Sequence, residues 1–163
     1  MSIILEGCDC SGKTTVANML CQNHGYTYKH FGPPLDKDSF MGWDILELLN
    51  RRMVFDRFHI GETVYPFVKG RQPVLKYQDF QILEEFMKIK KTILIYCRPP
   101  KSMIFEMLKQ RKDDFIDETE VDEIVKNFDK GFSASKLIKF RVDPFSIPTK
   151  ELCHIISTLE DSL

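Results

Sequence analysis

The fold of this chain is decided by one stretch near its start, Gly7-Cys8-Asp9-Cys10-Ser11-Gly12-Lys13-Thr14. The stretch fits the pattern G-x-x-x-x-G-K-[ST], which describes a phosphate-binding loop. The apolar run before it, residues 2–6, predicts a buried strand, and the run after it, residues 13–23, predicts a helix. A strand, a glycine-rich loop and a helix in this order bring backbone N–H groups and the positive end of a helix to one phosphate.

The residues of this loop have separate expected roles. Lys13 would reach the outer phosphates, and the hydroxyl of Thr14 would ligate Mg²⁺. We therefore expect ATP as the ligand, bound together with Mg²⁺. The alternative is a tight glycine turn that only connects a strand to a helix. The expected ATP-binding residues are Gly7, Cys8, Cys10, Ser11, Gly12, Lys13, Thr14 and Thr15.

Length and composition restrict the class of protein. A chain of 163 residues predicts one domain, residues 1–163, with a single core. The net charge of −1 gives no basic field that would favour nucleic acid. No apolar run approaches the roughly 20 residues that span a bilayer, and the N-terminus does not look like a signal peptide. We expect a cytoplasmic protein whose partners are small molecules rather than nucleic acid or membranes.

The five cysteines do not suggest a disulfide framework, since their number is odd and their spacing is scattered. Cys8 and Cys10 form a C-x-C pair, but no second Cys/His pair lies nearby at the spacing of a zinc site. We interpret both as small residues that fill the phosphate-binding loop.

Apolar runs alternate with segments of helical period along the rest of the chain. This alternation predicts an α/β fold with a parallel sheet covered by helices on both faces. The expected strands are residues 2–6, 26–31, 52–56, 92–97 and 137–142. The expected helices are residues 13–23, 39–50, 59–69, 75–90, 101–111, 119–133 and 148–160.

The carboxyl ends of these strands carry side chains that suit a phosphate site, and ligands of open α/β sheets bind at such ends. They are Asp9, His30, Asp56, Arg57 and Arg98. Asp56 ends an apolar strand, as in a Walker B element whose carboxylate helps to hold Mg²⁺, although a turn or helix-capping role is the alternative. The planar guanidinium of Arg57 suits a bidentate phosphate contact.

Three further features have two interpretations each. Residues 110–119 are either a solvated loop or a lid in which Arg111 or Lys112 closes on the transferring phosphate. Asp9, a carboxylate inside a phosphate-binding loop, either contacts the sugar hydroxyl of a second substrate or stabilises the loop. His59 either faces that substrate or has a surface or capping role.

Several of these motifs together resemble the thymidylate kinases. They are G-x-D-x-S-G-K-T-T, Asp56-Arg57-Phe58 and the charged loop around Arg111. The run from Asp56 to Tyr65 is similar to short phage-type deoxynucleotide kinases. The resemblance implies a three-layer P-loop kinase fold with strand order 2-3-1-4-5. It implies transfer of the γ-phosphoryl group of ATP to a deoxynucleoside monophosphate, first of all dTMP, and a possible homodimer through residues 39–50 and 59–69.

The resemblance also implies roles for single residues. Asp9 would contact the 3′-hydroxyl of the acceptor, Arg57 would hold its phosphate, and Tyr65 would lie near its base or sugar. The catalytic residues would be Lys13, Asp9, Arg57 and Arg111, the metal-binding residues Thr14 and Asp56, and the acceptor-binding residues Asp9, Phe31, Arg57, Phe58 and Tyr65.

Two departures from the family leave the acceptor open. The stretch His30-Phe31-Gly32-Pro33-Pro34 lacks the arginine that thymidylate kinases carry there, and Cys10 stands where they often have Arg or Gly. A deoxynucleoside kinase is therefore the alternative enzyme. A GTP-binding switch lacks support because the Asn-Lys-x-Asp motif is absent from the sequence. A protein that binds nucleotide without catalysis is the third alternative.

Overall fold

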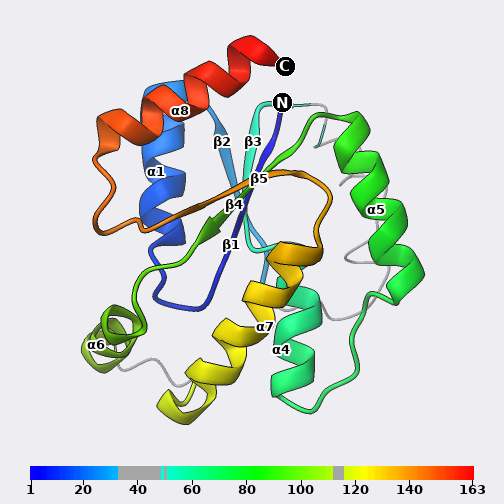
Figure 1. Ribbon diagram of the computed structural model, residues 1–163, viewed down its shortest axis with the longest axis vertical. Helices are drawn as coiled ribbons and strands as arrows, with labels where there is room; N and C mark the ends of the chain where they lie inside the picture. Colours follow the sequence, from blue (N-terminus) through cyan, green and yellow to red (C-terminus); the bar gives the residue numbers. More distant parts are fainter. Residues whose placement is uncertain (33–48, 50, 112–115) are drawn as a thin grey trace.

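The computed structural model describes residues 1–32, 49, 51–111 and 116–163. These residues contain a parallel sheet in the order β2-β3-β1-β4-β5, as predicted (Figure 1). Its strands are β1 (Ile3–Glu6), β2 (Thr27–His30), β3 (Met53–Asp56), β4 (Ile93–Cys97) and β5 (Ile138–Val142). Strand β1 lies at the centre, where Leu5 is paired with Asp56 of β3 and Glu6 with Tyr96 of β4.

The helices lie close to the predicted ranges. They are α1 (Lys13–His24), α4 (Gly61–Val68), α5 (Tyr77–Ile89), α6 (Lys101–Arg111), α7 (Val121–Ala134) and α8 (Thr149–Ser162). The segment predicted as one helix over 119–133 begins with a separate 3₁₀ turn, Glu118–Glu120, because Asp117 caps that turn by accepting the N–H of Thr119. The helix predicted over 39–50 and residues 112–115 of the candidate lid lie outside the described residues.

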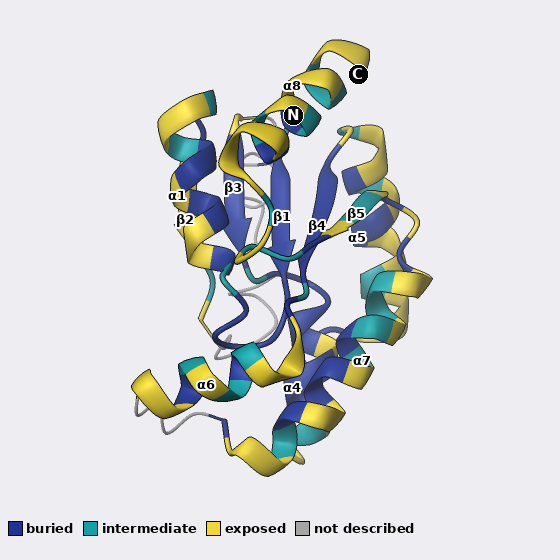
Figure 2. Cartoon of the chain, turned by 60° about the vertical axis from the view of Figure 1, so that its left-hand side comes forward, coloured by how far each residue is buried: buried dark blue, intermediate teal, exposed yellow. Residues whose placement is uncertain are grey.

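The alternation of side chains along the strands builds two apolar layers. Ile3 and Leu5 of β1 belong to a core shared with α1 and α8, whereas Ile4 belongs to a larger core shared with α4, α5 and α7. Figure 2 shows the buried strands between helices whose outer faces are exposed. Because both faces of the sheet are covered, its central strands are continuous apolar runs, which is the pattern visible in the sequence.

Two glycines of the phosphate-binding loop are required by its geometry. Gly7 has φ +146°, and a Cβ there would collide with the carbonyl oxygen of Cys97. Gly12 has φ +85°, and a Cβ there would lie 2.7 Å from the Cβ of Pro144. Both positions combine a left-handed backbone with close packing, so a side chain at either one would displace the loop.

The carboxyl ends of the strands meet at one edge of the sheet, and both chain termini lie at the opposite edge (Figure 1). The loop after β1 and the turn after β3 therefore come together, with α6 beside them. Within the described ranges, no helix is long and apolar enough to cross a membrane.

Candidate functional site

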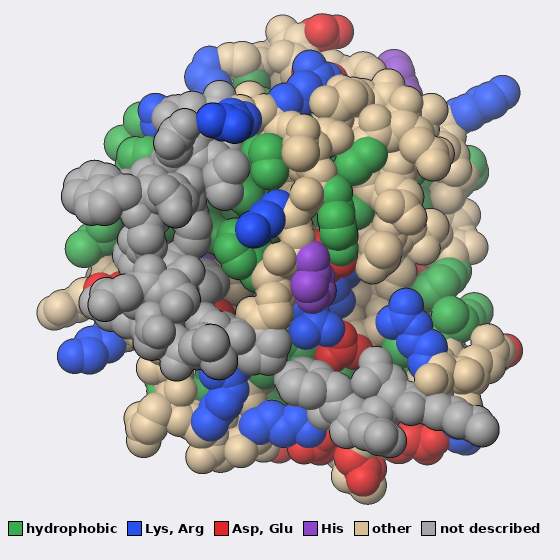
Figure 3. All heavy atoms as spheres, turned by 180° about the vertical axis from the view of Figure 1, so that it is seen from behind, with side chains coloured by type: hydrophobic (Ala, Val, Ile, Leu, Met, Phe, Trp, Pro, Cys, Tyr) green, Lys and Arg blue, Asp and Glu red, His purple; other side chains and the backbone are tan. Residues whose placement is uncertain are grey.

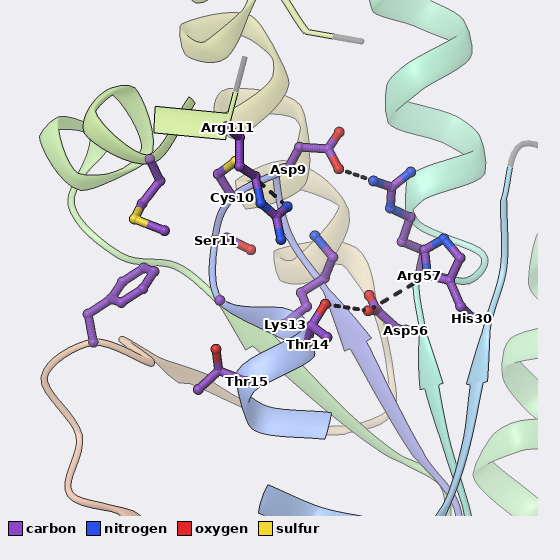
Figure 4. Close-up of a pocket in the computed structure, with 13 residues that line it drawn as sticks. Asp9, Cys10, Ser11, Lys13, Thr14, Thr15, His30, Asp56, Arg57 and Arg111 are labelled. Atoms are coloured by element: carbon purple, nitrogen blue, oxygen red, sulfur yellow. Dashed lines mark hydrogen bonds and ion pairs between the residues drawn. The ribbon is translucent and has the colours of Figure 1, made fainter. Parts of the chain in front are cut away.

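A pocket of about 160 Å³ opens at the carboxyl ends of β1, β2 and β3 (Figure 4). Its wall combines the phosphate-binding loop with residues that are distant in the sequence. The loop and the start of α1 contribute Asp9, Cys10, Ser11, Gly12, Lys13, Thr14 and Thr15. Other parts of the chain contribute His30, Asp56, Arg57, Met107, Arg111 and Phe145.

Lys13 is buried and held by its own loop. Its Nζ donates to the carbonyl oxygens of Gly7 at 2.8 Å and Cys8 at 2.7 Å. These two acceptors offset the cost of burying an ammonium group and keep it at the pocket. The backbone of Cys10 is left-handed, with φ +60°, in the middle of the loop. Left-handed residues of this kind are typical of loops whose successive N–H groups form an anion-binding concavity.

Both cysteines of the loop are buried. Burial raises the pKa of the Cys8 thiol to about 12, so it stays neutral at physiological pH. All five cysteines of the chain are free. In the part of the chain that the structure describes, no group of three or more His, Cys, Asp or Glu side chains is arranged to hold a metal ion. A metal at this site would therefore need ligands from a bound substrate and water.

Asp56 is arranged to supply one such metal ligand. Its Oδ2 accepts hydrogen bonds from the hydroxyls of Thr14 at 3.2 Å and Tyr28 at 2.9 Å, and the Nδ1 of His30 lies 3.7 Å away. Its Oδ1 is buried and has no hydrogen-bond partner among the described residues. A carboxylate at the pocket whose Oδ2 lies beside a threonine hydroxyl fits Mg²⁺, which proteins usually hold through one or two side chains plus phosphate oxygens and water.

Tyr28 keeps its proton in this arrangement. Burial, together with the hydrogen bond and the negative charge of Asp56, raises the pKa of its hydroxyl to about 12. The sequence analysis did not identify Tyr28, whose contact with Asp56 exists only because β2 pairs with β3.

Asp9 points away from the phosphate-binding loop and toward the turn after β3. One of its oxygens forms an ion pair with the guanidinium of Arg57, and the other accepts the hydroxyl of Tyr65 at 3.1 Å. Figure 4 shows Asp9 and Arg57 facing each other across the pocket. The guanidinium also lies 5.6 Å from the ring centre of Tyr65. The structure thus brings together three residues that the sequence separates by up to 56 positions, and it turns the negative charge of Asp9 toward a cation.

Arg111 is the last residue of α6, and its guanidinium lies over the loop, with Nη1 4.0 Å from the Sγ of Cys10 (Figure 4). This places one of the two predicted lid cations at the pocket. The other, Lys112, lies outside the described residues.

The structure corrects the expectation that Arg98 belongs to this site. Arg98 follows β4, but its Nε lies 3.3 Å from the carboxylate of Asp129 on α7, and another nitrogen donates to the carbonyl of Pro99. It does not line the pocket. The reason is that α7 offers a carboxylate on the far side of β4, which the sequence alone does not reveal.

Phe58 and Phe31 lie beside the pocket rather than in its wall. Phe58 is 1% exposed, and its ring centre lies 5.5 Å from that of Phe55 and 5.3 Å from that of Phe31. Phe31 is partly buried against the same cluster. A substrate contact of Phe58 would require its ring to leave this cluster, so the contacts proposed for these two residues remain predictions.

His59 has neither of the two roles that the sequence suggested. It is fully buried, and its Nε2 lies 2.9 Å from the Oε1 of Glu84 on α5. Glu84 also accepts the hydroxyl of Ser135 and the N–H of Lys136. Burial alone would raise the pKa of Glu84, but the hydrogen bonds from His59, Lys136 and Ser135 outweigh it and lower the pKa below 4.5. His59 therefore ties the turn after β3 to the core.

Two residues of the pocket wall, Met107 and Phe145, were not identified from the sequence. Met107 lies on α6, and Phe145 follows β5 directly after Asp143-Pro144. The only signal for Phe145 was its position just beyond the carboxyl end of a strand. Met107 had no signal of its own, because only the packing of α6 against this edge brings it to the pocket.

The surface seen from behind carries a histidine with basic and acidic side chains beside it near its centre (Figure 3). Basic side chains on this face are interspersed with apolar and acidic ones.

The chain is similar to proteins of known structure, although no protein-family model matches it. A relative is the SPbeta prophage-derived uncharacterized protein YorR of Bacillus subtilis (strain 168), which is 24% identical over 86% of this chain and 87% of its own. The crystal structure of YorR in complex with phosphorylated GDP has a TM-score of 0.78 and 25% identity, and the alignment covers 99% of this chain and 96% of that chain.

Two kinases of known structure share the fold at lower identity. Deoxyadenosine kinase from M. mycoides with bound dCTP has a TM-score of 0.62 and 20% identity, and both chains are covered completely. Shikimate kinase from Acinetobacter baumannii in complex with shikimate has a TM-score of 0.60 and 17% identity over 99% of this chain and 93% of that chain. The chain therefore has the P-loop kinase fold, built around a phosphate-binding loop at the carboxyl edge of a five-stranded parallel sheet.

Proposed function

We propose that the protein transfers the γ-phosphoryl group of ATP to a deoxynucleoside monophosphate, with dTMP as the first candidate. One observation carries this proposal: a single pocket joins the phosphate-binding loop to Asp56 and to the cluster of Arg57, Asp9 and Tyr65. The first part suits a nucleoside triphosphate, and the second supplies a cation and hydrogen-bonding groups for another substrate. The choice of dTMP depends on the resemblance to thymidylate kinases.

The donor side would use groups that are already in place. Lys13 would exchange the carbonyl oxygens of its own loop for phosphate oxygens, because these carry more negative charge. Thr14 and Asp56 would hold Mg²⁺, which supplies positive charge to the phosphates when bound. Arg111, above the loop, would add a second cation at the transferring group.

The acceptor side would use the opposite wall of the pocket. Arg57 would bind the acceptor phosphate through its planar fork, and Asp9 would accept a hydrogen bond from a sugar hydroxyl while Tyr65 fixes its orientation. Burial raises the pKa of Tyr65 well above 10, so its hydroxyl remains a donor. Phosphoryl transfer depends mainly on positioning and on compensation of charge, and these residues supply both.

A deoxynucleoside is the second candidate acceptor, and one contact favours it. Arg57 is already neutralised by Asp9, and the other basic groups that line the described pocket are Lys13, Arg111 and His30. Lys13 and Arg111 belong to the donor side. An uncharged acceptor would need no additional cation, whereas a monophosphate would have to compete with Asp9 for Arg57.

An acceptor panel tests the proposal. The protein is incubated with ATP and Mg²⁺ and, separately, with dTMP, dCMP, dGMP, dAMP, thymidine and deoxyadenosine, and the products are separated by chromatography. Formation of dTDP is the expected result. Formation of another deoxynucleoside diphosphate instead would show that the acceptor carries a different base. Phosphorylation of a nucleoside without turnover of any monophosphate would favour the second candidate. If no acceptor is phosphorylated with ATP as donor, and none with GTP as donor, both candidate functions are overturned.

A further inference from the structure

Glu6 is a buried carboxylate that the proposed reaction does not use directly. It is the last residue of β1, immediately before Gly7, and it is 1% exposed. Its Oε1 accepts three backbone N–H groups, from Phe58 at 3.1 Å, Ile60 at 2.9 Å and Gly61 at 3.3 Å. One side-chain oxygen of Glu6, at the end of the strand that leads into the phosphate-binding loop, thus holds the turn after β3 and the start of α4.

The segment that Glu6 holds contains Arg57 in a strained conformation. Arg57 has φ +68°, a left-handed backbone that a residue with a side chain adopts only when its surroundings fix it. Its own N–H donates to the carbonyl of Leu5 at 3.0 Å, and the next N–H, that of Phe58, donates to Glu6. The N–H groups before and after the Cα atom of Arg57 are therefore both bonded to β1. These two bonds fix the backbone from which the Arg57 side chain reaches Asp9.

We infer that Glu6 is a positioning residue that holds Arg57 at a fixed place relative to the phosphate-binding loop. This inference rests on the proposed function, in which Arg57 binds the acceptor phosphate. Glu6 and Gly7 are consecutive, so the same strand end sets the position of the donor loop and of the acceptor-binding arginine. Loss of the anchor would leave the donor loop intact and let Arg57 move.

The electrostatics of Glu6 follow from its burial and from the groups around it. Burial raises the pKa of Glu6 above 4.5, although the charge of His59 and the backbone N–H groups of Gly61 and Ile60 oppose this. A folded-state pKa above the unfolded value means that ionisation costs stability as the pH rises through this range.

Kinetics of three variants test the inference. In Glu6→Ala, kcat/KM for the acceptor should fall roughly 10- to 100-fold, while KM for the phosphate donor stays within about twofold, because misplacement affects only the acceptor side. In Glu6→Gln the loss should be a few-fold, since the oxygen is kept and only the charge is lost. Glu62→Gln is the matched control, because Glu62 is a buried carboxylate of α4 that lies 3.5 Å from Arg71, and it should match the wild type.

The outcomes separate positioning from folding. An equal loss for both substrates, or a Glu6→Ala variant with unchanged kinetics, would overturn the inference. If Glu6→Ala does not fold, Glu6→Gln decides: a few-fold loss confined to the acceptor supports the inference, and wild-type kinetics contradict it. Thermal unfolding of each variant shows whether the fold is retained.

Hydrogen exchange provides a test that does not depend on the reaction. The amides of Phe58, Ile60 and Gly61 should exchange at least tenfold faster in Glu6→Ala than in the wild type, because each loses its acceptor. Unchanged exchange at these three amides would overturn the anchoring even if the wild type phosphorylates none of the acceptors. A wild type that is inactive but shows the expected exchange would instead refute the proposed function alone.

Discussion

The phosphate-binding loop and the turn after β3 face the same pocket, but they are organised in opposite ways. The lysine of the loop is held by local contacts, because Lys13 donates to carbonyls five and six residues before it. The turn is held by distant ones, since Arg57 pairs with Asp9, 48 positions away, and His59 with Glu84, 25 positions away. A site built locally appears in the sequence as a motif, whereas a site built from distant contacts becomes visible only in the fold.

The same difference predicts how each half of the site responds to mutation. Changes in the loop should impair the chemical step while the fold persists. Changes around the turn should affect the second substrate or the stability of the fold, depending on which distant contact is removed. Four substitutions test this separation.

Lys13→Ala should have the largest effect, a decrease in kcat of about 100- to 1000-fold, because a positive charge at the transferring phosphate is lost. Steady-state kinetics with saturating ATP and acceptor measure it. Lys150→Ala, which removes an exposed lysine at the start of α8, serves as the control. A Lys13→Ala variant that kept kcat within about threefold of the wild type would contradict the assignment of the loop and favour a protein that binds nucleotide without catalysis.

Arg57→Ala should lower kcat/KM for the acceptor by about 100-fold and leave KM for ATP unchanged. Arg57→Lys should recover only part of the loss, because an ammonium cannot replace a bidentate fork. Measurement of both Michaelis constants over a grid of substrate concentrations distinguishes the two sides. An increase in KM for ATP as large as that for the acceptor would contradict the separation of a donor-binding loop from an acceptor-binding turn.

Asp56→Asn should shift the Mg²⁺ concentration that gives half-maximal activity upward by about tenfold. The physical reason is that the carboxylate beside Thr14 loses its negative charge, while the side chain keeps its shape. A titration of activity with Mg²⁺ at fixed ATP measures the shift, with Asp161→Asn on α8 as a control. An unchanged Mg²⁺ dependence would remove Asp56 from the metal site and leave it as a partner of Thr14 and Tyr28.

Glu84→Gln should have the smallest effect on activity, less than about threefold, but it should lower the free energy of unfolding by about 1–3 kcal/mol because a buried hydrogen-bond network loses its charged acceptor. The folded-state pKa of Glu84 is below 4.5, so the stabilisation is present above that pH and is lost as the pH falls through the folded-state value.

Urea unfolding at pH 7 and at pH 4 or lower tests this expectation. The difference between the wild type and Glu84→Gln should be largest at pH 7 and should shrink in acid. A difference that grew as the pH fell would show that Glu84 is not stabilised as a carboxylate in the folded protein.

Much of the fold could be predicted because its signals are local or periodic. Helix α6 was predicted at its observed bounds, and the strands to within about one residue at each end. The predicted strand order is also observed, although it came from the resemblance to known kinases rather than from the apolar pattern itself. Where the prediction differed, at Asp117 to Glu120, a side-chain cap decided the local structure.

The site could be predicted in part. Motif residues were found because phosphate binding requires glycine, lysine and threonine at fixed spacing, and Asp56 and Arg57 because they end an apolar strand. Arg98 directly follows a strand as well, yet it does not line the pocket, since its guanidinium pairs with the carboxylate of Asp129 on α7. Phe145 and Tyr28 were not predicted as site residues. Exposed aromatic side chains and tyrosines on edge strands are common, so neither residue gives a specific signal in the sequence.

The sequence by itself determined that this protein has a phosphate-binding loop on a parallel α/β fold, because backbone geometry there depends on residues within a few positions of each other. Only the tertiary structure decided where the charge of Asp9 points, that His59 is buried, and that Glu6 reaches the turn after β3. These contacts join groups 25 to 56 positions apart, and strand order and burial determine which groups meet, rather than spacing along the chain.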